Sequence, residues 1–432
     1  MLRKILKAFL IQELAASPGL QRLVVGFSGG LDSTVLLQAL AQEASAFSLP
    51  MLAVHVHHGL SPNADAWAQH AEAQCAALNI PVQICRVQVS PQGSVEAAAR
   101  TARRTAFAGV LKAGDVLLLA QHQDDQAETL LFRLLRGAGV RGLAAMAEVS
   151  RFPLGNGVFV PQWRPLLGVS RAELEQWARA EDLHWIEDES NADSRYARNF
   201  LRKEVFPLLR TRWPVVSETL AATAARLREA DELLMELAVE LASKTVDAQQ
   251  RLHIPQVLAL TPARQRLLLR HWLQQQDLLT PDEAMLDRIR KEAMLAREDA
   301  APLLQWEGAE IRRYREHLYA MRPLSVMPEN WDQIWNGEQD LLLPDGRFLR
   351  LESVPENLRV TYRRGGERVQ IAGHCRELKT LFQEHGVPPW ERERLPLLWR
   401  NNELLGVAGT DWGLRTDAPV TRLLLSARKT KS

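Results

Sequence analysis

The chain has 432 residues, of which 46% are hydrophobic and 24% charged, and its formal net charge is +1. This length predicts about two or three domains with substantial cores, and the near-zero charge gives no overall sign of a nucleic-acid partner. Three cysteines without a CxxC pair exclude a disulfide framework, so a reducing cytoplasm is the expected compartment.

The N-terminal stretch, MLRKILKAFLIQELAAS, is predicted to form an amphipathic helix rather than a signal peptide, because Lys7, Gln12 and Glu13 interrupt its apolar run. The apolar side chains expected on one face of this helix are Leu2, Ile5, Leu6, Phe9 and Leu10. No run in the sequence approaches the roughly 18 apolar residues of a membrane span.

Residues 21–190 alternate short apolar runs with helical periods. Four predicted strands each precede a predicted helix: LVVGF (23–27), MLAVHVHH (51–58), PVQICRVQV (81–89) and DVLLLAQH (115–122). This alternation predicts an α/β fold with a parallel, doubly wound sheet that has helices on both faces. The polar segments FSGGLDS, HVHHG and AQHQDDQAET directly follow strands. The carboxyl edge of the sheet is therefore the predicted ligand site.

The rest of the chain changes character twice. A long helical pattern follows Pro214, which predicts a helical domain over 214–335 after a catalytic domain over 1–213. The sequence LLLPDGRFLRLE predicts a β-hairpin around Pro-Asp-Gly. A strand at RVTYRR, a helix at ELKTLFQEHG and a strand at LLGVAGTDW complete a predicted small α/β domain over 345–432.

FSGGLDS has the composition of a phosphate-binding loop. Gly29 and Gly30 permit backbone angles closed to other residues and let N–H groups approach an anion, while Ser28 and Ser33 add hydroxyl donors. The N-terminus of the following helix supplies further donors and a partial positive charge. The loop is not a Walker loop, since no GxxxxGK[ST] pattern is present. Asp32 would repel a bare phosphate, so we expect it to bind Mg²⁺ or to cap the helix.

The pattern SGGxDS resembles the PP-loop of the N-type ATP pyrophosphatases. That superfamily cleaves ATP between the α- and β-phosphates, adenylates a substrate oxygen and lets a nitrogen or sulfur nucleophile displace AMP. The resemblance implies the superfamily's fold, the use of ATP and Mg²⁺, and a pyrophosphate held in the loop. The implied ATP-binding residues are Ser28, Gly29, Gly30, Leu31, Asp32 and Ser33, with Asp32 as the Mg²⁺ ligand.

Further segments resemble the tRNA(Ile)-lysidine synthetase family. They are HVHHGLSPNADAW (55–67), SVEAAARTARRTAF (94–107), AQHQDDQAETLLFRLLRGAG (120–139), WRPLL (163–167), IEDESNADSRYARNFLR (186–202) and RRGGERVQIAGHCRELKTLFQEHGVPPWERERLPLL (363–398). The resemblance implies that ATP adenylates O2 of the wobble cytidine in tRNA(Ile) with anticodon CAU. The ε-amine of free lysine then attacks the adjacent ring carbon and forms lysidine. One departure is His57, where many members have asparagine.

The segment after the fourth strand carries the residues expected to handle lysine. Asp125 and Glu128 are three apart and share a helix face, so they are expected to bind the lysine ammonium and to help remove its proton. His122 is expected to contact the phosphates or the developing charge. Asp124 fits either a helix cap or a metal ligand, and the sequence does not separate the two.

Basic residues recur at helical spacing in two places. Arg100 and Arg103 fall on one helix with Glu96, and the resemblance implies that these arginines meet phosphate or the flipped base, with Arg100 catalytic. The stripe of Arg195, Arg198 and Arg202 suits a phosphate backbone or the ATP phosphates.

The C-terminal domain is more basic than the chain as a whole. From residue 361 to 432 there are 13 Lys and Arg residues against 8 Asp and Glu. This domain is expected to grip a distant part of the same tRNA, and the residues expected to do so include Arg364, Arg368 and Lys379. Tyr362 and Trp390 are available for base stacking, although packing in the core is the expected role of both.

Three rival functions fit less well. A tRNA thiolase typically needs paired cysteines or an Fe–S site, whereas Cys75 and Cys85 fall in a predicted helix and a predicted strand. An amidotransferase-linked synthetase needs ammonia from a glutaminase, and no N-terminal cysteine nucleophile is present. A non-catalytic RNA-binding protein has no use for the carboxylates of DDxxET. The sequence therefore predicts a lysidine-forming ligase that uses ATP, Mg²⁺, L-lysine and tRNA, without a membrane or an obligatory protein partner.

Overall fold

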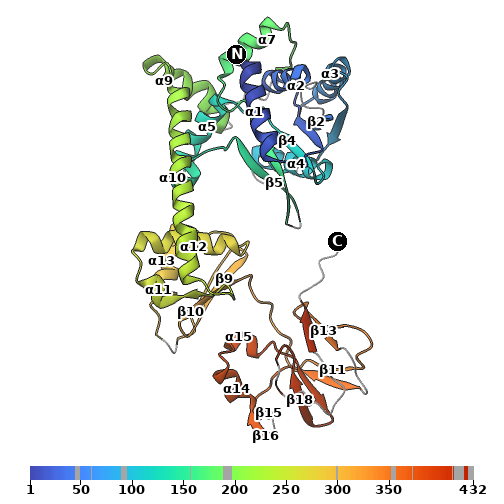
Figure 1. Cartoon of the computed structure of the whole chain (residues 1–432), viewed down its shortest axis with the longest axis vertical. Helices are drawn as coiled ribbons and strands as arrows, with labels where there is room; N and C mark the ends of the chain where they lie inside the picture. The colour runs from blue at the N-terminus through green and yellow to red at the C-terminus, as the bar shows by residue number, and fades with distance from the viewer. Residues whose placement is uncertain are drawn as a thin grey trace. The chain divides into compact units, whose positions relative to one another are not determined.

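Figure 1 shows a computed structural model of the chain. It describes residues 1–43, 49–59, 61–88, 95–155, 157–187, 197–297, 300–351, 357–371, 373–410, 412 and 423–426. The chain forms two compact units, Met1–Glu236 and Leu237–Ser432, and each has hydrophobic cores of its own.

A six-stranded sheet lies at the centre of the first unit, in the order β3-β2-β1-β4-β6-β5. Its strands are β1 (Arg22–Gly26), β2 (Met51–His57), β3 (Val82–Arg86), β4 (Asp115–Leu118), β5 (Val149–Gly155) and β6 (Val158–Trp163). All except β5 run parallel, which confirms the predicted α/β fold. The sequence gave no sign of β5, which pairs antiparallel with β6. The chain turns between them at Gly157, whose φ of +76° lies in the left-handed region that favours glycine.

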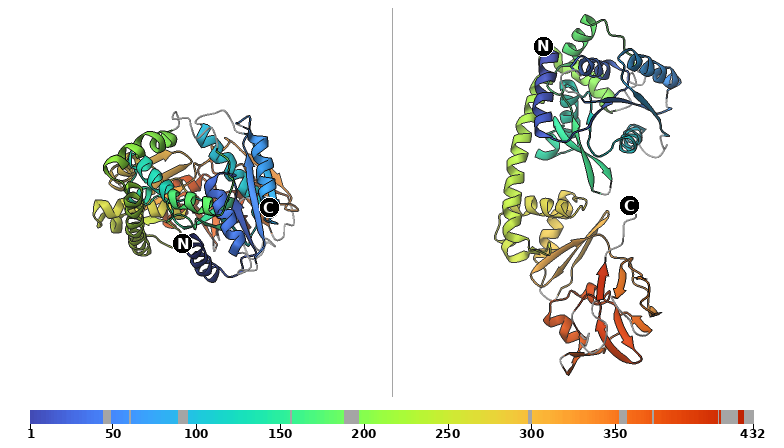
Figure 2. Two further views of the ribbon diagram at one scale, coloured as in Figure 1. Left: turned by 90° about the horizontal axis from the view of Figure 1, so that it is seen from above. Right: turned by 45° about the vertical axis from the view of Figure 1, so that its right-hand side comes forward.

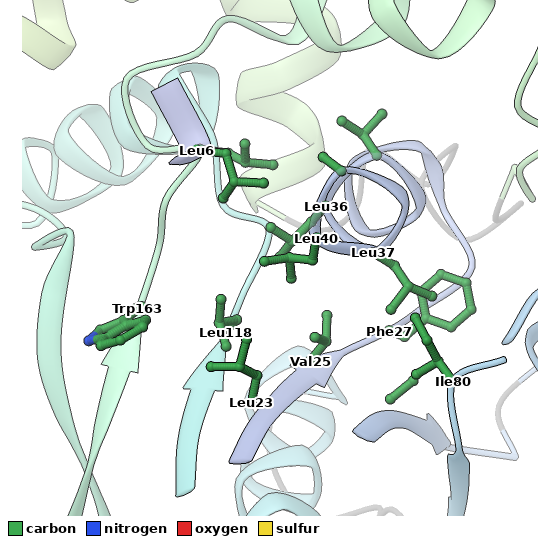
Figure 3. Close-up of a cluster of buried hydrophobic side chains, with 14 of the residues drawn as sticks. Leu6, Leu23, Val25, Phe27, Leu36, Leu37, Leu40, Ile80, Leu118 and Trp163 are labelled. Carbon is green, nitrogen blue, oxygen red and sulfur yellow. The ribbon is translucent and has the colours of Figure 1, made fainter. Parts of the chain in front are cut away.

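Helices cover both faces of this sheet (Figure 1). They are α1 (Leu2–Ala16), α2 (Leu31–Glu43), α3 (Ala64–Ala77), α4 (Val95–Val110), α5 (Gln123–Leu134), α6 (Val140–Leu143), α7 (Arg171–Ala180), α8 (Ala197–Phe200), the π-helical turn η3 (Leu201–Val205) and α9 (Phe206–Arg212). Side chains alternate along β1, so that Leu23 and Val25 join one core (Figure 3) while Val24 joins another with Phe107 of α4. Burial of each such side chain stabilises the fold by about 1.5–3 kcal/mol.

The N-terminal helix α1 presents a leucine stripe to the first of these cores. Leu2, Leu6 and Leu10 are buried there, and Phe9 packs beside them, as predicted. Ile5 is 37% exposed, so its predicted place on the buried face is wrong. It lies one position before Leu6, and one position turns a side chain by about 100° around the helix axis.

The second unit begins inside the long helix α10 (Val216–Thr245). The helices α11 (Ile254–Leu258), α12 (Pro262–Gln275) and α13 (Glu283–Arg288) follow, with the π-helical turn η4 (Ile289–Met294). They share a core with a sheet of β7 (Leu252–His253), β8 (Leu303–Trp306), β9 (Ala309–Tyr314) and β10 (His317–Met321) (Figure 2). The expectation of helix throughout 214–335 is therefore wrong at 303–321. Charged residues such as Glu310 and Arg313, which are buried here, hide the strand pattern.

The last part of the second unit is a small α/β region. One sheet contains β11 (Asp332–Trp335), β14 (Leu358–Thr361), β17 (Leu397–Arg400) and β18 (Glu403–Val407). The predicted hairpin is confirmed as β12 (Leu341–Leu342) and β13 (Phe348–Leu351), and β19 (Leu423–Ser426) extends it. A second hairpin, β15 (Arg368–Ile371) and β16 (His374–Glu377), precedes α14 (Leu378–Glu384) and α15 (Pro389–Arg392). Within the described parts of the chain, no helix has both the length and the apolarity to cross a membrane.

Candidate active site

The loop FSGGLDS joins β1 to α2, as predicted, and its serines brace it. The hydroxyls of Ser28 and Ser33 share a hydrogen bond of 3.0 Å, and Ser33 Oγ also donates to the Gly30 carbonyl at 3.0 Å. The Ser28 N–H donates to Ser33 Oγ at 3.2 Å. These bonds fix the loop ahead of α2, whose first N–H groups have no partner within the helix. The arrangement can hold a phosphate.

Gly29 is the position in this loop that requires glycine. Its φ is +83°, and a Cβ there would lie 3.0 Å from Cδ1 of Ile186. The Gly29 carbonyl also accepts a hydrogen bond of 2.9 Å from the Ile186 N–H. The segment after α7 therefore lies against the loop. Sequence reasoning missed Ile186, because a backbone contact of this kind leaves no residue pattern.

Asp32 lies in the first turn of α2 and carries a buried oxygen, Oδ1, without a hydrogen-bond partner in the described structure. Its other oxygen lies 3.6 Å from His122 Nε2 and 3.6 Å from Arg171 Nη1. Burial opposes ionisation of Asp32, but His122, Arg171 and Arg202 outweigh it and hold its pKa below the usual value. An ionised carboxylate with an unpaired buried oxygen suits a metal ligand better than a helix cap.

Arg171 is a second site residue that sequence reasoning missed. It begins α7, where the Glu173 N–H donates to Ser170 Oγ at 3.3 Å and the Ser170 N–H donates to the Glu173 carboxylate at 2.9 Å. This capping box is readable in the sequence as SRAE. The helix start was therefore predictable, whereas the approach of Arg171 to Asp32 depends on how α7 packs.

His122 connects Asp32 to α5. It is the N-cap residue of α5 and is fully buried. Its Nε2 lies 3.6 Å from Oδ2 of Asp32 and 3.6 Å from Oδ2 of Asp125. Burial disfavours the imidazolium form, but Asp32, Asp125 and Asp124 outweigh burial and raise the pKa of His122 above its usual value. His122 is thus a cation among carboxylates here, and its contact with phosphate stays a prediction.

Asp125 and Glu128 lie close together on α5 and meet two arginines. Arg198 of α8 donates to Glu128 Oε2 at 3.0 Å and to Asp125 Oδ1 at 3.2 Å. Arg202 of η3 donates to Glu128 Oε1 at 2.6 Å and to Asp125 Oδ1 at 3.0 Å. Glu128 is only 3% exposed. These four residues form a largely buried, charge-balanced group, which we call the charge cluster.

The charge cluster gives Arg198 and Arg202 partners that the sequence did not suggest. Both were expected on phosphate, and both contact carboxylates in this structure. Burial would lower the pKa of Arg202, but Glu128, Asp125 and Asp32 raise it. A phosphate contact would require either arginine to leave its carboxylates, and it stays a prediction. The third residue of the predicted stripe, Arg195, lies outside the described residues.

Asp124, next to Asp125, holds helices together. Its Oδ2 accepts a hydrogen bond of 2.9 Å from the Arg171 N–H at the start of α7. Its Oδ1 accepts from Arg210 of α9 at 2.6 Å and from Ser217 of α10 at 2.8 Å. The structure supports neither role left open by the sequence, because His122 is the helix cap and both Asp124 oxygens accept from protein donors.

Comparisons with known proteins agree with the order of these parts along the chain. A PP-loop domain model matches residues 4–209, a TilS substrate binding domain matches 252–319 and a TilS substrate C-terminal domain matches 358–419. The chain is 48% identical over 425 residues to the tRNA(Ile)-lysidine synthase of Pseudomonas aeruginosa, with 93% of each chain covered. It is 43% identical over 391 residues to that of Xanthomonas campestris pv. campestris, with 88% of this chain and 89% of the relative covered.

The chain belongs to the tRNA(Ile)-lysidine synthase family. The predicted family is therefore confirmed, and with it an enzyme of the ligase class built on a PP-loop domain. Among solved structures, the U34-tRNA thiolase NcsA from Methanococcus maripaludis aligns with a TM-score of 0.43 and 17% identity, over 53% of this chain and 78% of the thiolase. A likeness at this level carries no argument about the reaction.

In this member of the lysidine synthase family, Arg100 and Arg103 of α4 lie in a positively charged region. Loss of solvation, followed by the charges of Arg100 and Arg198, lowers the pKa of Arg103. Neither α4 arginine forms an ion pair with a carboxylate among the residues that the structure describes. Such a region suits a polyanion, and the roles of both arginines stay predictions. The side chain of Glu96 lies outside the described residues.

Three further arginines, none of them singled out from the sequence, hold the loop of residues 142–147 after α5. Arg133 donates to two of its carbonyl oxygens at 2.8 and 3.0 Å, and Arg164 donates to another at 2.7 Å. Arg228 of α10 donates to two more. Burial, followed by Arg100 and Arg228, lowers the pKa of Arg164 to about 10. Carbonyl partners of this kind give no sequence signal, because every residue carries one.

The histidines of HVHHG hold the end of β2 in place. His55 Nδ1 lies 3.0 Å from the Phe27 carbonyl, and burial lowers the pKa of His55, so the neutral ring donates to that carbonyl. His57 Nε2 lies 3.2 Å from Asp65 Oδ1. Arg86 of β3 donates to the same oxygen at 2.8 Å. The family difference at His57 therefore falls on a contact between strands and helix α3.

The candidate tRNA-binding residues of the second unit differ in how free they are. Arg364 lies 3.6 Å from Asp332. Arg368 and Lys379 are exposed and form no ion pair with a carboxylate in the described parts of the chain. Tyr362 and Trp390 are buried, so packing rather than base stacking is their role, as expected.

Proposed function

We propose that this chain ligates free L-lysine to C2 of the wobble cytidine in tRNA(Ile) with anticodon CAU. ATP binds with its β- and γ-phosphates at the loop of residues 28–33. The cytidine O2 attacks the α-phosphorus and pyrophosphate leaves; the lysine ε-amine then attacks C2, loses a proton and displaces AMP. The observation that supports this scheme best is the meeting of the phosphate-type loop, Asp32 and a buried acidic pair in a lysidine synthase family member.

Asp125 and Glu128 bind the ammonium group of lysine in this proposal. They already hold two guanidinium groups, so the pocket favours cations. The ammonium must replace one of these groups, because two positive charges already balance the two carboxylates. The phosphates of ATP would attract Arg198 or Arg202 and so vacate a position for the ammonium. ATP is therefore expected to bind before lysine.

The same exchange prepares a base for the reaction. A buried carboxylate that loses a guanidinium partner binds a proton more readily. Glu128, the more buried of the pair, can then take the proton that the lysine amine must lose before it attacks C2. The arginine that leaves stays near the α-phosphate, where negative charge develops during adenylation.

Asp32 fits a Mg²⁺ ligand, because its Oδ1 is buried and unpaired and its pKa is held low. A magnesium ion held by Asp32 would neutralise charge on the ATP phosphates. Among the described residues, no group of three or more His, Cys, Asp or Glu side chains is placed to hold a metal. This agrees with an ion bound mainly through the phosphates of its nucleotide.

Substrate grip away from the anticodon is assigned to the second unit. Arg368 and Lys379, which are exposed, and Arg364 beside them in sequence supply charge for tRNA phosphates. The model matches to a TilS substrate binding domain and a TilS substrate C-terminal domain support this assignment.

The test of the proposed function uses purified protein, Mg-ATP, radiolabelled lysine and an unmodified tRNA(Ile) transcript with anticodon CAU. We expect label in this tRNA only when ATP is present, with one AMP and one pyrophosphate released for each lysine. Methionine tRNA, which carries the same anticodon, is the control and should stay unlabelled. AMP release without label would remove lysine as the nucleophile. Absence of both products would remove the proposed function.

A further inference from the structure

The segment from 197 to 213 has two faces, of which the inner one belongs to the active site. Arg198 and Arg202 point from it into the charge cluster. Leu201 and Phe206 are buried from the same side, in a small core with Ala127 of α5. The inner face is thus fixed by both charge and packing, and this fixes where the opposite face lies.

The outer face of this segment carries Phe200, Lys203, Leu208, Arg212 and Trp213. The apolar members are 47% (Phe200), 69% (Leu208) and 59% (Trp213) exposed, and both basic members are exposed. Two aromatic rings and a leucine on one short helical segment exceed the single exposed apolar residues that need no explanation. The outer face therefore has the composition of a contact surface.

Trp213 is held on an ordered backbone although its ring is exposed. Its N–H donates to the Leu209 carbonyl at 2.8 Å, and its carbonyl accepts from the Val216 N–H at 3.1 Å. Pro214 follows and fixes the backbone further. An indole presented from a rigid turn loses little conformational entropy when it binds.

Charge indicates what kind of partner fits. Residues 197–213 contain five Lys and Arg residues and one acid, Glu204. Lys203 and Arg212 form no ion pair with a carboxylate among the described residues. Exposed aromatic rings next to unpaired basic side chains are the composition that binds single-stranded nucleic acid, through base stacking and phosphate contacts. A purely apolar protein partner would leave these basic groups without a role.

We propose that the outer face binds unpaired bases of the anticodon loop beside the wobble cytidine. Trp213 and Phe200 stack on those bases, and Lys203 and Arg212 contact the phosphates between them. The inference rests on the proposed function for its partner and adds the place where the loop docks. That place is consistent with the chemistry, since the inner face of the same segment contacts Asp125 and Glu128.

The experiment measures binding of a fluorescently labelled anticodon stem-loop of tRNA(Ile) to the full chain by anisotropy. Trp213→Ala is expected to weaken binding about tenfold, because one stacked base is lost. Trp213→Phe should restore most of the affinity. Leu233→Ala, which changes another exposed apolar side chain (66% exposed), is the matched control and should bind as wild type. A blunt RNA duplex should bind all four proteins equally.

Charge is tested separately from stacking. Lys203→Gln and Arg212→Gln should each lower the slope of log affinity against log salt by about one. Unchanged affinity in Trp213→Ala, when the wild type binds and modifies the stem-loop, would refute the stacking face and leave the proposed function intact. Failure of the wild type to bind the stem-loop would overturn both. A change in self-association instead of RNA affinity, seen by sedimentation, would show that a second copy covers this face.

Discussion

Two arginine–carboxylate pairs, one in each unit, have the same length and differ in burial. Arg202 Nε lies 2.6 Å from Glu128, whose side chain is 3% exposed. Arg359 Nη2 lies 2.6 Å from Asp332, and both side chains are open to solvent. Water screens the second pair, whereas the first depends on its partners to replace lost solvation. The distance between two charges therefore does not indicate their importance, and burial does.

The largest expected effect comes from removing the buried acid. Glu128→Ala leaves two partly buried guanidinium groups without their shared carboxylate, and we expect a loss of about 3 kcal/mol in the stability of the first unit. Lysine incorporation should disappear as well. Thermal unfolding and the radiolabel assay measure the two effects. Asp332→Ala is the matched control, and a fall in melting temperature as large as that of Glu128→Ala would remove the distinction by burial.

A smaller effect is expected on the order of binding. A non-hydrolysable ATP analogue should tighten lysine binding about tenfold, which corresponds to about 1.4 kcal/mol, because phosphates draw an arginine out of the charge cluster. Arg198→Gln frees part of the acidic pair in advance, so it should bind lysine more tightly than wild type without nucleotide and gain less from the analogue. Calorimetric titration of lysine measures this. Equal gains in both proteins would contradict the exchange of cations.

Buried and exposed histidines should respond differently to pH. The pKa of His55 is lowered mainly by burial, so below about pH 6.5 the unfolded chain binds a proton that the folded chain refuses. Stability is full above that pH and falls as pH decreases towards the folded pKa, by at most about 1.4 kcal/mol per pH unit. His55→Asn should flatten this dependence between pH 7.5 and 5.5 in thermal unfolding. His374→Asn, at an exposed site in the second unit, is the control, and an equal flattening there would refute the assignment to His55.

The smallest expected effects concern the exposed arginines of the second unit. Arg368→Gln and Lys379→Gln should each weaken tRNA binding about threefold and lower the salt slope by about one, because each side chain is free to contact phosphate. Arg376→Gln should do less, since Arg376 Nη2 already lies 2.7 Å from Glu384. Filter binding at several salt concentrations compares the three variants. An equal loss in Arg376→Gln would show that surface pairing does not reserve an arginine.

Much of the first unit was predictable because its signals are local. The apolar runs before Ser28 and His122 predict the strands, and the two glycines predict the loop between β1 and α2. The three-residue spacing of Asp125 and Glu128 places them on one face of α5. In each case the physical cause acts within a few residues, so the sequence displays it.

The remaining features depend on distant packing. Arg198 reaches Glu128 across 70 positions, and Asp124 meets Ser217 across 93. Neither partner is implied by a helix period, because any exposed stripe of arginines has the same spacing. The strands at 303–321 were missed for a related reason, since Glu310 and Arg313 are buried with partners supplied by the fold. Family resemblance named several of these residues without indicating what they touch.

Asp124 and Asp125 are neighbours in sequence, yet one joins three helices and the other faces the reacting groups. A mutational scan scored by growth or product yield would mark both as indispensable and would count two catalytic acids where there is one. A background stabilised elsewhere in the first unit would separate them, because added stability rescues a lost brace and cannot replace a lost reactant. Adjacent invariant-looking letters can therefore record two unrelated selective pressures.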